Sequence, residues 1–212
     1  MTVMGVDLRS VARRSSTVLS LDEEKRMVTC DRFGKNSELL CLAALLQPTV
    51  IAIGSPLTLP SGLCCSDPAC DCTLALPDAK GRHCELELSR IGIGRFFTNK
   101  WSIVRDLINR GVKLKYQLNE LGFKVIEVYP YATKVLLFGD TLPRKKSGDY
   151  LNILKERVTS VIEGFQGCSD GLDQNTCNAA LNAYIGLLYL QHRTDSLGDS
   201  REGMLVIPTL PR

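Results

Sequence analysis

The sequence predicts an α/β fold with a mixed sheet, an antiparallel meander followed by parallel strands, and helices on both faces. Three short apolar segments at 3–7, 16–21 and 26–33 follow one another closely, as in a meander. The fully apolar run at 50–53 is typical of a parallel strand buried on both faces. Beyond it, segments with helical spacing surround a further strand, and such βαβ units build a parallel sheet with helices on both sides.

The individual elements follow from periodicity and from signals at their ends. The segment 37–47 has apolar residues at helical spacing and stops before Pro48, which cannot continue a helix. The segment 101–121 has a long apolar face, and Gly122 suits the position that follows a helix. The apolar run 124–128 is the next strand. The remaining expected elements are helices at 83–90, 132–138, 148–162 and 174–192, and a closing strand at 204–207.

Composition bounds the class of protein. The 212 residues suit a single domain, 1–212, with 44% hydrophobic residues, and the net charge of +3 does not by itself indicate nucleic-acid binding. No apolar run approaches the roughly 20 residues that span a bilayer, so no membrane association is expected. The amino terminus lacks a secretion signal, which favours the cytoplasm. The oligomeric state is left open, a homodimer included.

Two strands present a carboxylate near their ends. Asp7 closes the first strand, and Glu127 lies in the strand at 124–128. Ligands of open α/β sheets bind beyond the carboxyl ends of the strands, and carboxylates there suit Mg²⁺ or Mn²⁺. We therefore expect Asp7 and Glu127 to share a divalent cation. The alternative is that both are solvated acids, although Glu127 is costly to bury between Ile126 and Val128 unless it is paired.

A set of short motifs, in order along nearly the whole chain, resembles one known family. The motifs are Gly5-Val6-Asp7, Ile53-Gly54-Ser55-Pro56-Leu57, Gly81-Arg82-His83-Cys84-Glu85, Arg110-Gly111, Val125-Ile126-Glu127-Val128-Tyr129-Pro130, the helix start from Asp173 to Ala180, and Val206-Ile207-Pro208. The chain resembles the family known as domain of unknown function 429, described as predicted nucleases of the ribonuclease H fold. The resemblance implies a ribonuclease H-like sheet whose acids bind Mg²⁺ or Mn²⁺ for phosphodiester hydrolysis.

The resemblance also implies which residues form the site. Asp7, Glu127 and Asp173 match acids of the family, although Asp173 also suits the cap of the last helix. Two positions depart, because Gly54 and Asn178 stand where the family has acids. The expected phosphate contacts are the basic residues Arg9, Lys100, Arg110, Lys134 and Lys145. Arg9 lies in a short basic run with Arg13 and Arg14, and Lys145 lies in another with Arg144 and Lys146. The resemblance implies a phosphate-binding role for the other three and for Lys145.

Three functions are compatible with this pattern. The first is a metal-dependent nuclease with a depleted acid site and weak, single-metal or no activity, because two-metal hydrolysis needs several carboxylates. The second is a non-catalytic nucleic-acid-binding protein of the same fold, for DNA or RNA. The third is a nucleotide-binding or phosphotransferase role, since actin-like ATPases share the core sheet.

A Cys-rich excursion interrupts the pattern at about 56–84. It lacks periodicity, and a loop of this length is usually functional or held by something else. The candidate ligands for a structural Zn²⁺ are Cys64, Cys65, Cys70, Cys72 and Cys84, with His83 beside the last. Free buried thiols and disulfides are the alternatives. Outside the excursion, Cys30, Cys41 and Cys177 are expected in the core, and Cys168 has no evident role.

Overall fold

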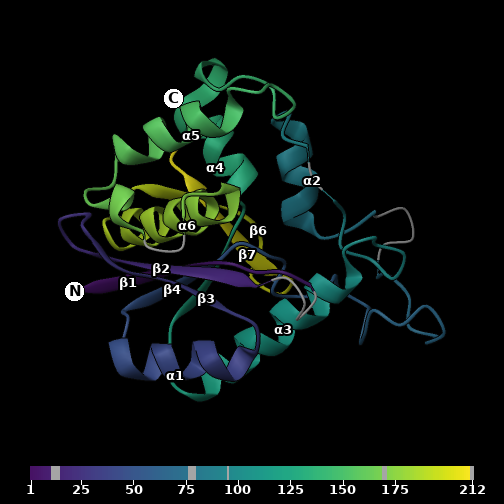
Figure 1. The fold of residues 1–212 in the computed structure, drawn as a ribbon. Helices are drawn as coiled ribbons and strands as arrows, with labels where there is room; N and C mark the ends of the chain where they lie inside the picture. The colour runs from purple at the N-terminus through teal and green to yellow at the C-terminus, as the bar shows by residue number, and fades with distance from the viewer. Residues whose placement is uncertain (11–14, 76–79, 95, 169–170, 211–212) are drawn as a thin grey trace.

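A mixed sheet in the strand order β3-β2-β1-β4-β5-β7-β6 forms the centre of the molecule (Figure 1). The structure is a computed structural model and describes residues 1–10, 15–75, 80–94, 96–168 and 171–210. β1, β4, β5 and β7 run parallel, while β2 and β3 continue one edge and β6 the other in antiparallel pairing. The strands are β1 (Thr2–Asp7), β2 (Ser16–Asp22), β3 (Met27–Phe33), β4 (Val50–Ile53), β5 (Val125–Val128), β6 (Thr194–Asp199) and β7 (Gly203–Pro208).

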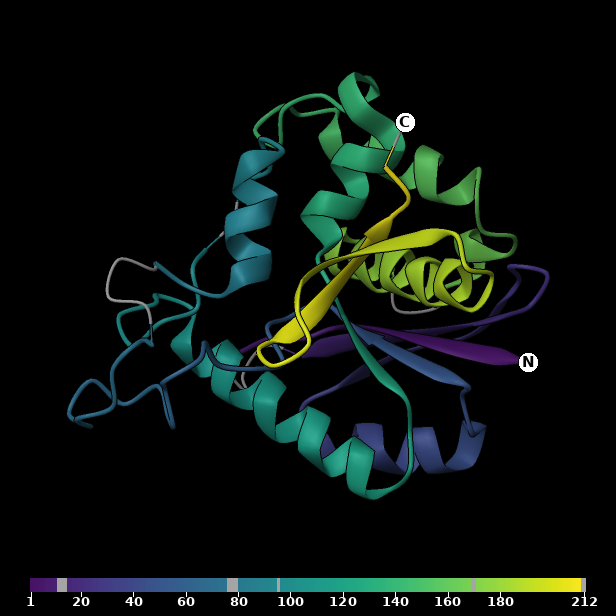
Figure 2. The ribbon, with the colours of Figure 1, turned by 180° about the vertical axis from the view of Figure 1, so that it is seen from behind.

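Helices cover both faces of this sheet (Figures 1 and 2). On one face lie α1 (Asn36–Leu46) and α3 (Arg105–Glu120), packed on side chains from β1 and β4 such as Met4 and Ile51. On the other lie α4 (Pro130–Phe138), α5 (Tyr150–Thr159) and α6 (Gln174–Leu190). The short helix α2 (His83–Arg90) packs against β6 and β7. The predicted fold class is therefore confirmed.

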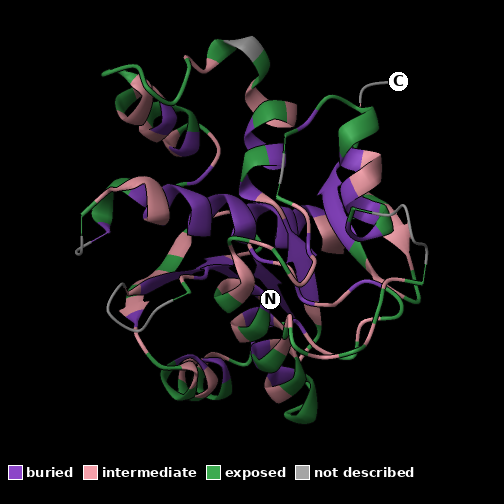
Figure 3. Cartoon of the chain, turned by 90° about the vertical axis from the view of Figure 1, so that its right-hand side faces the viewer, coloured by how far each residue is buried: buried purple, intermediate pink, exposed green. Residues whose placement is uncertain are grey.

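Helix α6 lies directly on the sheet and is buried along most of its length (Figure 3). Gly5 of β1 makes this close approach possible. A Cβ at Gly5 would lie 2.1 Å from the nitrogen of Ala183 and 2.2 Å from the oxygen of Ala179, so no other residue fits without moving the helix. The approach fixes the distance between the end of β1 and the polar residues of α6.

Two elements differ from the sequence prediction. No element was predicted for strand β6, whose sequence TDSLGD has almost no apolar residues; the strand forms by pairing along its whole length with β7 at the sheet edge. The long helix was expected from residue 101 but begins at Arg105, after a series of turns. None of the described helices is long and apolar enough to cross a membrane.

Two cysteines outside the excursion are joined in a disulfide. Cys30 of β3 bonds to Cys168, which follows the short 3-10 helix η2 (Phe165–Gly167), with Cα atoms 5.7 Å apart. The sequence had placed Cys30 in the core as a thiol and assigned no role to Cys168. Cys177 is buried as expected, whereas Cys41 is exposed on α1, contrary to the prediction.

Candidate functional site

Asp7 ends β1 beneath the amino-terminal part of α6. Only 6% of it is exposed, and its Oδ1 accepts a hydrogen bond of 3.2 Å from Nδ2 of Asn178. Nε of Arg9 lies 3.8 Å from Oδ2, an oxygen for which the described residues provide no hydrogen-bond partner. Burial raises the pKa of Asp7 to about 6, and the positive charge of Arg9 opposes that shift. Asp7 is thus a buried carboxylate with one oxygen that accepts no hydrogen bond from the described residues.

A lysine from α4 completes the cluster. Nζ of Lys134 donates a hydrogen bond of 3.1 Å to Oδ1 of Asn178 and lies 6.0 Å from the centroid of the Tyr150 ring. The side chain of Lys134 is only 5% exposed. Burial lowers the pKa of Lys134 to about 8. Asn178 thus links an ammonium group to the Asp7 carboxyl group through its amide.

The sequence predicted that an acid is missing at Gly54, and the side chain of Asn182 lies at that position. Asn182 lies one turn beyond Asn178 on α6, and its Nδ2 donates 2.8 Å to the backbone oxygen of Val6. A Cβ at Gly54 would lie 2.5 Å from that Nδ2, so the amide fills the space that an acid at position 54 would need. Sequence reasoning missed Asn182. The signal was the spacing of four between two asparagines in an otherwise apolar helix.

Glu127 does not join this cluster, so the expected Asp7–Glu127 pair has to be corrected. Glu127 is in register with Ile53 of β4, and Ile53 with Val6 of β1. Residues in register point to the same face, and successive residues of a strand alternate. Glu127 therefore faces the side of α1 and α3, while Asp7, next to Val6, faces α6.

Buried partners already neutralise Glu127. Its Oε2 accepts hydrogen bonds of 2.7 Å from Nη1 of Arg82 and from the backbone nitrogen of Leu57, and its Oε1 accepts 2.6 Å from Nη2 of Arg82. Arg82 is 2% exposed and also pairs with Glu85, which accepts from Thr98. Sequence reasoning recorded the burial cost of Glu127 but did not find Arg82 as its partner. The carboxylate holds the loop after β4 in place.

The other expected site residues have separate positions. Asp173 caps α6 by accepting from the backbone nitrogens of Asn175 and Thr176 at 2.8 and 2.9 Å, as its capping interpretation predicted. It also forms an ion pair of 3.1 Å with Arg32. Arg9 donates to the side-chain oxygen of Asn175, which keeps its guanidinium group at the mouth of the cluster.

The remaining basic residues differ in how free they are. Arg110 donates to the backbone oxygens of Arg9 and Gly34, at 2.6 and 2.7 Å, and also to side chains of Ser16 and Asn36, so it ties loops together. Lys100 donates to the backbone oxygen of Cys70, far along the excursion. Lys145 is exposed and close enough to Lys134 to help lower its pKa. Arg13 and Arg14 lie outside the described residues.

A second cluster lies in the excursion. The sulfur atoms of Cys64, Cys65, Cys70 and Cys72 all lie within 4.8 Å of one another, with 3.6 Å between Cys64 and Cys70. Cys84, also expected as a ligand, lies apart from them: it is buried against α2's apolar neighbours, and burial raises its pKa to about 12. Four of the five predicted zinc ligands therefore lie together in the structure.

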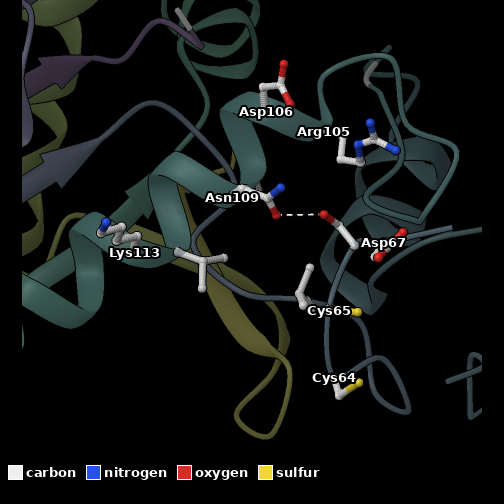
Figure 4. Close-up of a pocket in the computed structure, with 10 residues that line it drawn as sticks. Cys64, Cys65, Asp67, Arg105, Asp106, Asn109 and Lys113 are labelled. Atoms are coloured by element: carbon white, nitrogen blue, oxygen red, sulfur yellow. Dashed lines mark hydrogen bonds between the residues drawn. The ribbon is translucent and has the colours of Figure 1, made fainter. Parts of the chain in front are cut away.

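The excursion is anchored at its neck and along α3. Glu202 accepts from the backbone nitrogens of Ser61 and His83, at 2.8 and 2.7 Å, and so joins the two ends. Ser66 donates 2.6 Å to Oδ1 of Asn109, the dashed bond beside a hollow of about 510 Å³ between the loop and α3 (Figure 4). The Cys64 and Cys65 side chains line that hollow.

Comparison with known proteins places the fold. No family model matches the chain, and no curated protein matches it, so the family resemblance stays a prediction. A solved structure of Thermus thermophilus RuvC matches with a TM-score of 0.51 and 11% identity, covering 91% of this chain and 97% of that one. The chain has a ribonuclease H-like fold. At this identity the likeness concerns the ribonuclease H-like fold alone.

Proposed function

We propose that the protein binds the phosphate backbone of nucleic acid at the carboxyl ends of β1 and β4, with weak or absent phosphodiester hydrolysis. The observation that carries the proposal is the cluster of Asp7, Asn178 and Lys134 with Arg9 at its mouth. Two cationic side chains flank a single carboxylate there. Lysine and arginine are the usual partners of phosphate groups. The ribonuclease H-like fold and the family resemblance support nucleic acid as the source of those phosphates.

The donor set argues against efficient two-metal hydrolysis. Two cations about 3.5–4 Å apart need several carboxylates to hold them. Among the described residues Asp7 is the one carboxylate bonded to Asn178, which itself offers a neutral oxygen that already accepts from Lys134. Gly54 has no ligand atom, and Asp173 is already engaged in the cap of α6 and in the ion pair with Arg32. These residues do not fit a pair of cations. Binding of a single Mg²⁺ or Mn²⁺ at Asp7 stays a prediction.

Binding is tested by fluorescence anisotropy with labelled single-stranded and double-stranded DNA and RNA. We expect affinity to fall steeply with salt, because each phosphate contact releases counterions. Arg9→Gln should weaken binding to every sequence by a similar factor, whereas Arg157→Gln on α5, distant in sequence and outside the cluster, serves as the control. Salt-insensitive binding, or none at low salt, would contradict the proposal.

Hydrolysis is tested by restoring acids. Gly54→Asp needs space that Asn182 occupies, so the restoring variant combines Gly54→Asp, Asn178→Asp and Asn182→Ala. With Mg²⁺ or Mn²⁺ we expect this variant to cleave nucleic acid faster than the natural protein. Equal cleavage by the two proteins would show that the acid set is not what limits activity.

We also propose that Cys64, Cys65, Cys70 and Cys72 bind one structural Zn²⁺. Tetrahedral zinc with Zn–S bonds of about 2.3 Å places its sulfur atoms about 3.8 Å apart. The 3.6 Å between Cys64 and Cys70, and the 4.8 Å limit for all four, suit that geometry. Such a metal would supply folding free energy to a segment with little apolar core.

Metal analysis of protein purified without chelators tests the zinc site. We expect about one zinc per chain, lost in Cys70→Ser. Cys41→Ser, at an exposed cysteine outside the cluster, is the matched control and should keep the metal. A zinc content near zero in the natural protein would end this proposal.

A further inference from the structure

Lys134 places a fixed positive charge inside the acid site. The residue follows β5 closely, in the second turn of α4, and its side chain is 5% exposed. Nζ donates 3.1 Å to Oδ1 of Asn178, and the Nδ2 of the same amide donates 3.2 Å to Oδ1 of Asp7. The lysine is therefore bonded into the cluster.

Asn178 is the residue that lets the two charges coexist in this arrangement. Its amide accepts from the ammonium group on one side and donates to the carboxyl group on the other. An aspartate at 178 could accept from Lys134 but could not donate to Asp7, and two carboxylates would face each other. The amide at 178 and the lysine at 134 thus form a matched pair.

We propose that the ammonium group of Lys134 takes the place of a divalent cation in this site. Resting on the proposed function, this means that the phosphate backbone is bound without metal. The ammonium group neutralises Asp7 through Asn178, and it occupies the ligand oxygen that Asn178 would otherwise offer to a cation. A divalent ion at Asp7 would meet the lysine charge at close range in a buried site, where like charges repel strongly.

The direct test is a titration with Mn²⁺, followed by electron paramagnetic resonance, that needs no nucleic acid. We expect weak binding by the natural protein and binding at least about tenfold tighter by Lys134→Met, since that change removes the charge and frees the Asn178 oxygen. Lys113→Met, at an exposed lysine of α3 on the other face of the sheet, is the control and should change the affinity less than about twofold. Thermal unfolding confirms that each variant is folded. Tight Mn²⁺ binding by the natural protein, or unchanged affinity in Lys134→Met, would overturn the inference.

A second measurement separates this inference from the proposed function. Oligonucleotide binding by the natural protein should be equal in EDTA and in Mg²⁺, and in EDTA it should be weaker in Lys134→Met. Binding that requires Mg²⁺ would overturn the role of Lys134 and leave the proposed function standing. Absence of binding in both media would overturn the proposed function, while the Mn²⁺ titration still decides whether Lys134 excludes the cation.

Discussion

Replacing Glu127 by glutamine tests whether this residue stabilises the fold through Arg82. The carboxylate accepts two bonds from Arg82 and one from Leu57. Glutamine has one oxygen, so its amide nitrogen must face at least one of these donors at a distance of 2.6 or 2.7 Å. Hydrogen bonds to charged groups contribute about 1.5–3 kcal/mol each, so we expect a loss of about 3 kcal/mol.

Urea denaturation followed by circular dichroism at pH 7 measures this loss. In thermal unfolding followed by the same signal, the melting temperature should fall by about 6–12 °C, given about 2–4 °C per kcal/mol for a chain of this size. Glu163→Gln is the control, because its ion pair with Arg26 is at the surface and should contribute less than about 1 kcal/mol. The Mn²⁺ affinity should not change in Glu127→Gln. A stability loss below about 1 kcal/mol, or a loss of Mn²⁺ binding without a stability loss, would refute the reasoning.

Three further predictions concern stability. Burial of Asp7 raises its pKa from 3.8 to about 6, so the folded state binds the proton more tightly, and stability should fall as the pH rises from about 4 to about 6. Asp7→Asn should remove that fall and stabilise the protein at pH 7.5 by up to about 3 kcal/mol in urea denaturation; parallel pH curves would contradict this. Arg110→Met should lower the free energy of unfolding by about 2–4 kcal/mol in urea denaturation, because the backbone oxygens of Arg9 and Gly34 lose their donor. An unchanged urea midpoint would show that these hydrogen bonds do not stabilise the fold. Reduction of the Cys30–Cys168 disulfide should lower the free energy of unfolding by about 2–4 kcal/mol, and mass spectrometry of non-reduced peptides should find the linked pair.

The sequence was sufficient for the fold class because local patterns and pairing agree in most of the chain. The buried run at 50–53 and the apolar face of α6 both pack where their periodicity indicates. Strand β6 was missed because an edge strand can be held by backbone hydrogen bonds to its neighbour without apolar residues of its own.

The site was predicted only in part, for reasons of register and of distant pairing. Asp7, Asn178 and Lys134 do lie together. Glu127 could not be separated from them by spacing along the chain, because the face that a strand residue presents depends on register with its neighbours. Arg82, 45 residues earlier in the chain, binds Glu127 from within a segment that has no periodicity.

The two hydrogen bonds that Glu202 accepts from Ser61 and His83 have a consequence for how the sequence can vary. Because one carboxylate holds the nitrogens of both Ser61 and His83, the chain leaves the body and returns to it at almost the same point. The described residues of the intervening segment then form a pendant module, extending beside α2 and α3 (Figure 2). Provided that Arg82 at its end is kept as the partner of Glu127, such a module can be shortened, exchanged or grafted while the path of the sheet stays the same. Variation at this point of the chain would change the outline of the molecule and leave its framework intact.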